Sequence, residues 1–251
     1  MFNKENTTLV IQGNSYLNYT EKFIDQYLKY FKNVIFSTWI DDPIKETGNF
    51  KLIRNNPVSP GPGNINLQIK SSFSGCVAAT TKYIIKTRSD ILIEDPEKWL
   101  EFFSQNYIDN RIFVLGLSKI YIFSPRDQIF AGEKNDMINL FNISLHGGDY
   151  DSTPSLFSMY PELYLGTSYY ARFSDKVKFF MKVPSIYLYA NALSRDQALK
   201  EWNIIGTKYM YPVSKNLKYQ WPKHMPTGEY NYQQTALTYG EFWHEDLTND
   251  C

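Results

Sequence analysis

Residues 82–90 read KYIIKTRSD, and this stretch decides the fold class. Tyr83–Thr87 is rich in aromatic and β-branched residues, which is typical of a strand. Alternation along a strand places Lys86, Arg88 and Asp90 on one side. Because ligands of open α/β sheets bind beyond the carboxyl ends of the strands, the polar end of this segment is a candidate site.

Strands and helices alternate outward from this stretch. The predicted strands are Thr8–Gln12, Val34–Thr38, Lys51–Arg54, Tyr83–Thr87 and Arg111–Leu117. One helix is predicted to begin with an Asn18 cap and Glu21 and to carry Phe23, Tyr27 and Phe31 at helical spacing. A second spans Asn64–Thr80, with Ile65, Ile69, Phe73 and Val77 on one face, and a third begins at Asp95-Pro96. Further predicted helices are Lys134–Phe141, Pro161–Tyr170 and Arg195–Trp202.

This order predicts an α/β fold, a Rossmann-like domain with a mostly parallel central sheet flanked by helices. No repeat or linker divides residues 1–251, so we expect a single domain. Residues 209–243 are rich in Tyr, Trp and Pro without a clear period, and we expect irregular elements there.

Composition excludes several classes of protein. The chain has 26 basic and 26 acidic residues, without the basic excess of a nucleic-acid binder. Cys76 and Cys251 are too few for a disulfide framework, and we expect a reduced, cytoplasmic location, free or peripheral to a membrane. No signal peptide or transmembrane stretch is predicted. Motifs of serine hydrolases, zinc proteases and P-loop kinases are missing.

Three polar strand ends are expected to form one site. They are Gln12-Gly13, Ser37–Trp39 with Thr38 at its centre, and Lys86–Asp90. Lys86 and Arg88 suit a diphosphate, since an arginine fork matches phosphate oxygens. Asp90 suits Mg²⁺ or Mn²⁺. The alternative is an Arg–Asp ion pair at a sheet edge.

Other residues add candidate ligand contacts. Gly13 allows close approach of the backbone, and Trp39 suits stacking on a base or sugar. Asn64 and Gln68 lie at i, i+4 on one helix face and suit a base or ribose. The alternatives are an ordinary turn, a core tryptophan and solvated helix residues.

Candidate acid–base and metal-binding residues lie further along. Glu162 follows Pro161 at a helix start and suits a general base, or else a helix-dipole partner. Asp127 is the second candidate for the general base, and Asp136 is a further candidate for the same role. His146 lies in a loop, and His244 is a candidate metal ligand beside acidic residues. The alternative for each histidine is a structural or exposed position.

Several motifs together resemble the WavE lipopolysaccharide-synthesis family, which is similar to glycosyltransferases of the GT-A type. They are VIQG at 10–13, STW at 37–39, NINLQIKSS at 64–72, KYIIKTRSD at 82–90, FSPRDQIFAG at 123–132 and PELYLG at 161–166. The resemblance covers residues 8–170. Asn14 departs from the family pattern, in which Pro or a small apolar residue follows the glycine.

The resemblance implies a GT-A-like fold and a nucleotide-sugar donor. It places Asp90 in the position of the metal-binding Asp-x-Asp motif, with Arg88 where that motif has its first Asp. Mn²⁺ or Mg²⁺ is the implied cofactor. Arg88 and Lys86 would supply part of the positive charge that such a metal normally provides. An inverting reaction would need a general base, and Glu162 is the first candidate for it and Asp127 the second.

We therefore expect a glycosyltransferase that moves a sugar from a nucleotide-sugar to a hydroxyl of a glycan acceptor, a surface polysaccharide or a glycoprotein glycan. Residues 1–125 would form the nucleotide-sugar-binding half and 126–251 the acceptor-side half. One alternative is a sugar nucleotidyltransferase, although Asn14–Asn18 is not its Gly-rich basic loop. The other is a non-catalytic carbohydrate-binding protein.

Overall fold

The computed structural model describes residues 1–16, 19–115, 125–147, 161–170, 172, 202–204, 219–224 and 230–235. The strands are β1 (Thr7–Gln12), β2 (Asn33–Trp39), β3 (Lys51–Asn55), β4 (Tyr83–Arg88), β5 (Leu92–Ile93), β6 (Ile112–Val114), β7 (Ile129–Glu133), β8 (Trp202–Ile204), β9 (Tyr219–His224) and β10 (Tyr230–Thr235). The helices are α1 (Thr20–Tyr27), α2 (Ile65–Ala78), α3 (Pro96–Asn106), α4 (Lys134–Phe141) and α6 (Pro161–Tyr170), and a 3₁₀ turn, Pro62–Asn64, precedes α2.

The central sheet has seven strands in the order β3-β2-β1-β4-β7-β6-β8. The first four are mutually parallel, β7 runs antiparallel to β4 and β6, and β8 is parallel to β6. The predicted α/β architecture with a mostly parallel sheet flanked by helices is confirmed. Because β7 lies beside β4, the sheet takes strands from both expected halves, 1–125 and 126–251.

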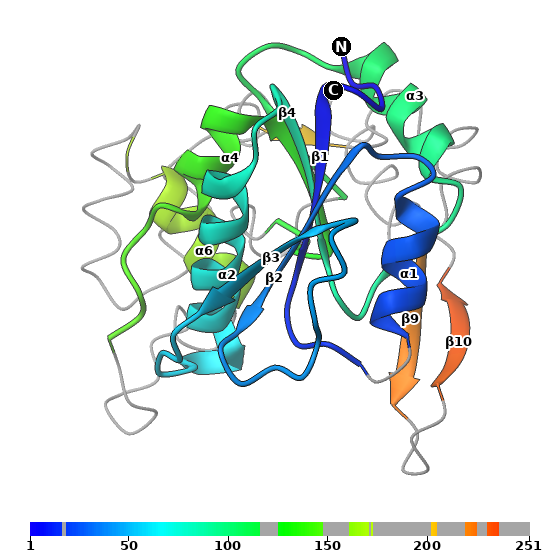
Figure 1. Ribbon diagram of the computed structural model, residues 1–251. Coiled ribbons are helices and arrows are strands. Elements are labelled where there is room, and N and C mark those ends of the chain that lie inside the picture. The colour runs from blue at the N-terminus through cyan, green and yellow to red at the C-terminus, as the bar shows by residue number, and fades with distance from the viewer. Residues whose placement is uncertain are drawn as a thin grey trace.

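Strand alternation divides the core between the two faces of the sheet. Val10 and Ile84 belong to the cluster that α2, α4 and α6 complete. Leu9, Ile11 and Ile85 belong to the cluster that α1 and α3 complete. Figure 1 shows these two groups of helices on opposite sides of the sheet. Burial on both faces explains why β1 and β4 read as continuous apolar runs.

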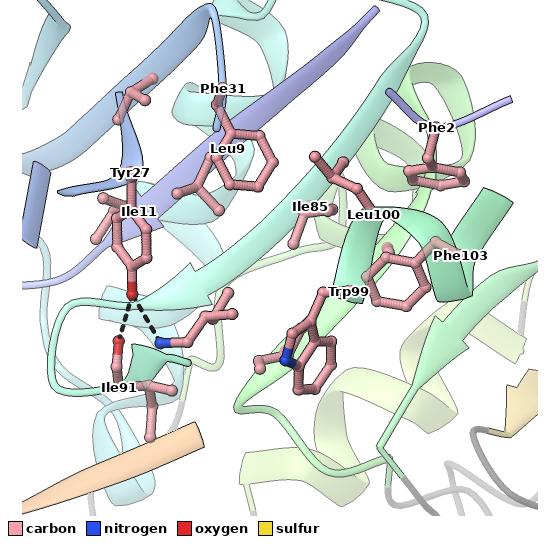
Figure 2. Packing of buried hydrophobic residues seen from close by; sticks show 14 of the residues in the cluster. Phe2, Leu9, Ile11, Tyr27, Phe31, Ile85, Ile91, Trp99, Leu100 and Phe103 are labelled. Carbon is pink, nitrogen blue, oxygen red and sulfur yellow. Dashed lines mark hydrogen bonds between the residues drawn. The ribbon is translucent and has the colours of Figure 1, made fainter. Parts of the chain in front are cut away.

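Aromatic side chains dominate the core beneath α1 and α3 (Figure 2). Trp99 and Phe103 are fully buried, with ring centroids 5.8 Å apart. The Tyr27 hydroxyl accepts a hydrogen bond from Ile93 N at 2.8 Å and donates to Ile91 O at 3.5 Å, which anchors α1 to the segment after β4. Each buried side chain of this size contributes about 1.5–3 kcal/mol by leaving water.

Helix α1 differs from its prediction at both ends. It begins at Thr20 after Tyr19, which makes no side-chain capping bond, and the expected cap, Asn18, lies outside the described residues. Thr20 Oγ1 instead accepts a hydrogen bond from Tyr16 N at 2.8 Å. Phe31 lies beyond the last helical residue, although its side chain is still buried. A turn bonded to the Tyr27 carbonyl returns the chain to the core.

Helix α2 buries a different face from the predicted one. Ile65 and Ile69 are buried as expected, but Val77 is 49% exposed. The buried face continues through small residues, Ser71, Ser72, Gly75 and Cys76. A Cβ on Gly75 would lie 2.5 Å from Val10 Cγ1, so close approach of α2 to β1 requires glycine there.

The last predicted elements are partly wrong. Within residues 209–243 two regular strands occur, β9 and β10, which pair antiparallel, and β9 also pairs with β5. Trp202 lies in β8 rather than at the end of a helix, and residues 195–201 are outside the described residues. The strand expected over Arg111–Leu117 is shorter, Ile112–Val114.

Candidate functional site

The three predicted strand ends lie side by side at one edge of the sheet. In the register, Gln12 pairs with both Ser37 and Arg88. Gly13 N donates to Ser37 O at 3.1 Å, and Ser89 N donates to Gln12 O at 2.8 Å. These bonds fix the turns that leave β1 and β4, so the side chains after them face a common space.

A polar pocket of about 180 Å³ occupies that space. Its lining residues that the sequence predicted are Gln12, Gly13, Trp39, Asn64, Gln68, Arg88, Asp90 and Asp127. The remaining lining residues are Asn14, Tyr16, Gly63, Leu67, Ser71 and Ser89. The pocket therefore lies between the carboxyl ends of β1 and β4, the start of α2 and the segment before β7.

A second pocket of about 460 Å³ adjoins the polar pocket. Asn14, Trp39 and Leu67 line both cavities and form their shared wall. The other lining residues of the second pocket are Ser15, Asp41, Asp42, Pro43 and Pro57. An elongated ligand can therefore extend from the charged strand ends, past Trp39, into the larger and less polar space.

Arg88 binds two carboxylates at the floor of the polar pocket. Its Nε donates to Asp90 Oδ1 at 2.9 Å and its Nη2 to Asp90 Oδ2 at 2.6 Å. Its Nη1 donates to Asp127 Oδ2 at 3.2 Å. Burial acts to lower the pKa of Arg88, but the two carboxylates outweigh it and raise the pKa above its ordinary value. The guanidinium is therefore charged at every relevant pH.

Gln68 lines the pocket and carries a buried amide nitrogen without a partner among the described residues. The side chain is 7% exposed, and its Nε2 has no hydrogen-bond partner among the described residues. Gln12, on the opposite wall, is satisfied because its Oε1 accepts from Ser71 Oγ at 2.8 Å. An unmet buried donor costs about 1–3 kcal/mol.

Gly13 is required by both conformation and space. Its φ is +127°, in a region that side-chain-bearing residues rarely adopt. A Cβ at this position would lie 2.4 Å from Ser89 Oγ. The glycine therefore allows the turns after β1 and β4 to approach each other closely, and its expected approach to a nucleotide stays a prediction.

Thr38 does not line either pocket. It is fully buried, and its Oγ1 donates to Asp42 Oδ2 at 2.7 Å. The same Asp42 oxygen accepts from Ser15 N at 2.6 Å. Burial acts to raise the pKa of Asp42, but the hydrogen bonds from Ser15, Thr38 and Ile44 outweigh it and lower the pKa. Thr38 therefore supports the loop after β1, in place of the expected ligand contact.

Lys86 also lies beneath the pocket instead of lining it. Its side chain is fully buried, and its Nζ donates to the main-chain oxygen of Asp127 at 2.9 Å. The ammonium lies 5.4 Å from the ring centroid of Phe130 and 5.8 Å from that of Phe141. Direct binding of a ligand by Lys86, as the sequence suggested, does not fit this position.

Glu162 lies beside the pocket without lining it. It stands in the first turn of α6, next to Pro161, whose ring packs against the pocket residue Gly63. Burial and the charge of Asp127 raise the pKa of Glu162, while Arg126 and Arg88 oppose them. A carboxylate with a raised pKa at the rim of a polar pocket has the property of a general base.

His146 and Asp136 do not line the pocket. His146 contacts the Tyr164 ring, with centroids 5.1 Å apart, and its backbone pairs with the Asn66 side chain. Asp136 belongs to α4, and burial raises its pKa. His244 lies outside the described residues.

The carboxylates at the pocket are already engaged by an arginine. No cluster of three or more His, Cys, Asp or Glu side chains occurs in the part of the chain that the structure describes. Asp90 and Asp127 are the carboxylates at the pocket, and the Arg88 guanidinium binds both of them. Metal binding by Asp90 or His244 stays a prediction.

Helical spacing could have found some of the residues that sequence reasoning missed. Leu67 follows Asn64 by three positions and Ser71 follows Gln68 by three, so both lie on the predicted polar face of α2. Asn14, Tyr16 and Ser89 come directly after strand ends. Their contribution depends on the turns after β1 and β4, which no motif in the sequence specifies.

Comparison with known proteins gives distant structural matches. No protein-family model matches the chain, which leaves the WavE resemblance without that support, and no curated protein matches it. A crystal structure of S. aureus TarS matches 66% of this chain at 12% identity with a TM-score of 0.42, and the chain covers 33% of that protein. A crystal structure of S. aureus TarS 1-349 matches 66% of this chain at 12% identity with a TM-score of 0.40, and the match covers 55% of that TarS chain. No helix among the described residues is long and apolar enough to cross a membrane.

Proposed function

We propose that this protein is a glycosyltransferase that takes a sugar from a nucleotide-sugar. The observation that carries the proposal is the polar pocket at the ends of β1 and β4, whose lining combines the fixed guanidinium of Arg88 with the side-chain amide of Gln68. A fixed cation and a buried donor suit the diphosphate and hydroxyl oxygens of such a donor. The resemblance of the sequence to GT-A-type transferases points the same way.

The adjoining pockets divide the proposed donor into two parts. The sugar and diphosphate would occupy the polar pocket, where Asn14, Asn64 and Gln68 offer neutral amide groups. The nucleoside would occupy the larger pocket, with Trp39 at the shared wall suited to stacking on the base. The two volumes, about 180 and 460 Å³, suit a ligand of this length.

The chemistry of transfer uses the charges already in place. Negative charge grows on the diphosphate as the bond to the sugar breaks, and Arg88 is held ready as a fixed cation. Glu162 would take the proton of the acceptor hydroxyl, with Asp127 as the second candidate. Mn²⁺ or Mg²⁺, with Asp90 as a ligand, would add positive charge at the diphosphate.

The resemblance extends the proposal to the acceptor and the location. We propose a glycan hydroxyl of a surface polysaccharide or a glycoprotein as acceptor, and a cytoplasmic site of action. One observation favours a second function, non-catalytic carbohydrate binding. Arg88 is already engaged by two carboxylates, and carboxylates, amides and a tryptophan together suit sugar hydroxyls.

A thermal-shift screen against UDP, GDP, CDP, CMP and their sugars, with and without Mn²⁺, tests the proposal. Binding to the native state adds about 2.7 kcal/mol at a hundredfold excess over Kd, so a donor should raise Tm clearly. We expect one nucleotide class to do so, and its sugar to be transferred or hydrolysed with release of the nucleotide. A shift with free glycans alone would replace the transferase with the binding protein. Pyrophosphate release from a nucleoside triphosphate and a sugar phosphate would indicate a nucleotidyltransferase.

A further inference from the structure

Lys86 has an unusual environment for a charged side chain. It lies in β4 on the same face as Ile84, in a position where strand alternation would place an apolar residue. In the register it pairs with Phe130 of β7, and Phe141 of α4 covers it. Its ammonium is fully buried and donates to a main-chain carbonyl, that of Asp127.

Packing alone does not account for a lysine at this position. Burying an ammonium in an apolar core is costly, and a methionine of similar length would fill the same space without that cost. The two phenyl rings offset part of it through cation–π attraction. A residue that lowers stability at its position is a candidate for a role in the neighbouring site.

The neighbouring site has a charge imbalance that Lys86 corrects. Asp90 and Asp127 carry two negative charges at the pocket, and Arg88 supplies one positive charge. These three groups sum to one negative charge, and Arg126 and Glu162 beside them add one group of each sign. Lys86 brings the sum of these charges to zero from beneath the floor.

We propose that Lys86 is a positioning residue of the donor site. Its ammonium holds the main chain of Asp127, and through Asp127 it steadies Arg88. Its charge also offsets the carboxylates so that the pocket accepts an anionic ligand. This role rests on the proposed function, because it assumes that a nucleoside diphosphate group binds above Asp127.

The environment of Lys86 predicts a pH dependence. Burial and, to a smaller extent, the charge of Arg88 lower its pKa, while the charges of Asp127 and Asp90 oppose them, and the net result is a pKa of about 8. Cys76, which faces Lys86 from α2, has a pKa raised to about 12 by burial and stays neutral below that pH. The positive charge under the pocket is therefore lost as pH rises through about 8.

The experiment compares wild type, Lys86→Met and Lys98→Met. Lys98 is an exposed lysine on α3, paired with Asp95, and serves as the matched control. The affinity for UDP and GDP is measured from pH 7 to 9.5, where the phosphates no longer titrate. Wild type and Lys98→Met should lose about tenfold in affinity over this range. Lys86→Met should bind weakly at pH 7 and show no loss. Equal affinity and equal pH dependence in all three proteins would overturn the proposal.

A ligand-free measurement applies even if Lys86→Met does not fold. NMR titration of the lysine side chains in wild type should show one resonance with a midpoint near pH 8, below the ordinary value of about 10.4. Asp127→Asn should lower that midpoint, because the Asp127 charge raises it. If a nucleotide binds but every lysine titrates above pH 9.5, the role of Lys86 is wrong and the proposed function stands. If one lysine titrates as expected but no nucleotide binds, the proposed function fails and the donor-site role fails with it.

Discussion

Arg88 and Asp90, two residues apart at the end of β4, form a parallel two-bond ion pair: Nε to Oδ1 at 2.9 Å and Nη2 to Oδ2 at 2.6 Å. The sequence left open whether these residues form an ion pair or line a ligand site. The structure shows the pair within the lining of the pocket. The guanidinium that stabilises the strand end therefore also lines the pocket.

Arg88→Ala should destabilise the protein and abolish nucleotide binding. It leaves two carboxylates without their shared partner, so we expect a loss of about 2 kcal/mol in the free energy of unfolding. This is less than for a fully buried pair, because a quarter of the Arg88 side chain is exposed. Urea unfolding measures it. Arg88→Lys keeps the positive charge but loses the two-pronged guanidinium, so its free energy of unfolding should fall between those of wild type and Arg88→Ala. Equal stability of these three proteins would contradict the pairing.

Gly13→Ala should disturb the strand-end turn more than the same change at Gly48. Both glycines have positive φ, but a Cβ on Gly48 meets nothing within 4 Å. We expect about 1 kcal/mol of destabilisation from backbone strain at Gly48 and about 2–3 kcal/mol at Gly13. Ser89→Ala in the Gly13→Ala background should restore part of the difference. The double-mutant cycle measures this coupling, and strictly additive effects would rule out the contact.

Strand ends were the most predictable part of the site. Gln12, Gly13, Arg88 and Asp90 follow apolar strands, and parallel strands bring their carboxyl ends to one edge. Asp127 was less predictable as a neighbour of Arg88, because its position depends on the antiparallel pairing of β7 with β4. Such long-range pairing leaves no local pattern in the sequence.

The other wrong predictions each have a structural cause. Lys86 shares a side with Arg88, as alternation predicted, but it lies two residues before the strand end, where Phe141 of α4 covers it. Thr38 is turned inward by its bond to Asp42. The apolar face predicted for α2 included Val77, whereas the helix packs on β1 through Gly75.

Glu162→Gln should lower turnover by about 100-fold or more while raising stability at neutral pH. Because the pKa of Glu162 is raised, the folded state holds its proton more tightly than the unfolded state. Wild-type stability is therefore lost as pH rises from the ordinary pKa of a glutamate to the raised pKa of Glu162. The glutamine variant does not titrate and avoids this loss. Rates from pH 5 to 8 together with urea unfolding measure both effects.

Glu97→Gln is the matched control for Glu162→Gln. Glu97 also follows a proline in the first turn of a helix, but it is exposed on α3. Turnover should be unchanged, and stability should fall slightly because a favourable helix-dipole charge is lost. In Asp127→Asn the acidic limb of the rate profile should move to lower pH, since Asp127 raises the pKa of Glu162. Full turnover by Glu162→Gln would remove Glu162 from the role of base.

Lys86→Met should be more stable than wild type at pH 7. A pKa lowered from 10.5 to about 8 corresponds to about 3 kcal/mol of unfavourable burial, of which the lost bond to Asp127 cancels about 1 kcal/mol. Between pH 8 and 10.5 the unfolded lysine binds a proton that the folded one does not, so this contribution to wild-type stability rises with pH. The advantage of Lys86→Met should shrink over that range. An advantage independent of pH would show that the pKa of Lys86 is not lowered in the folded protein.

The central claim is that the polar pocket binds a nucleotide-sugar, and calorimetric titration of Gln68→Leu tests it most directly. Gln105→Leu is the matched control, because Gln105 is an exposed glutamine on α3. We predict that wild type and Gln105→Leu bind the same nucleotide-sugar with equal affinity. Gln68→Leu should bind it at least about tenfold more weakly, since a buried donor loses its ligand acceptor. Equal affinity of all three proteins, or no binding of any nucleotide-sugar by wild type, would contradict the account.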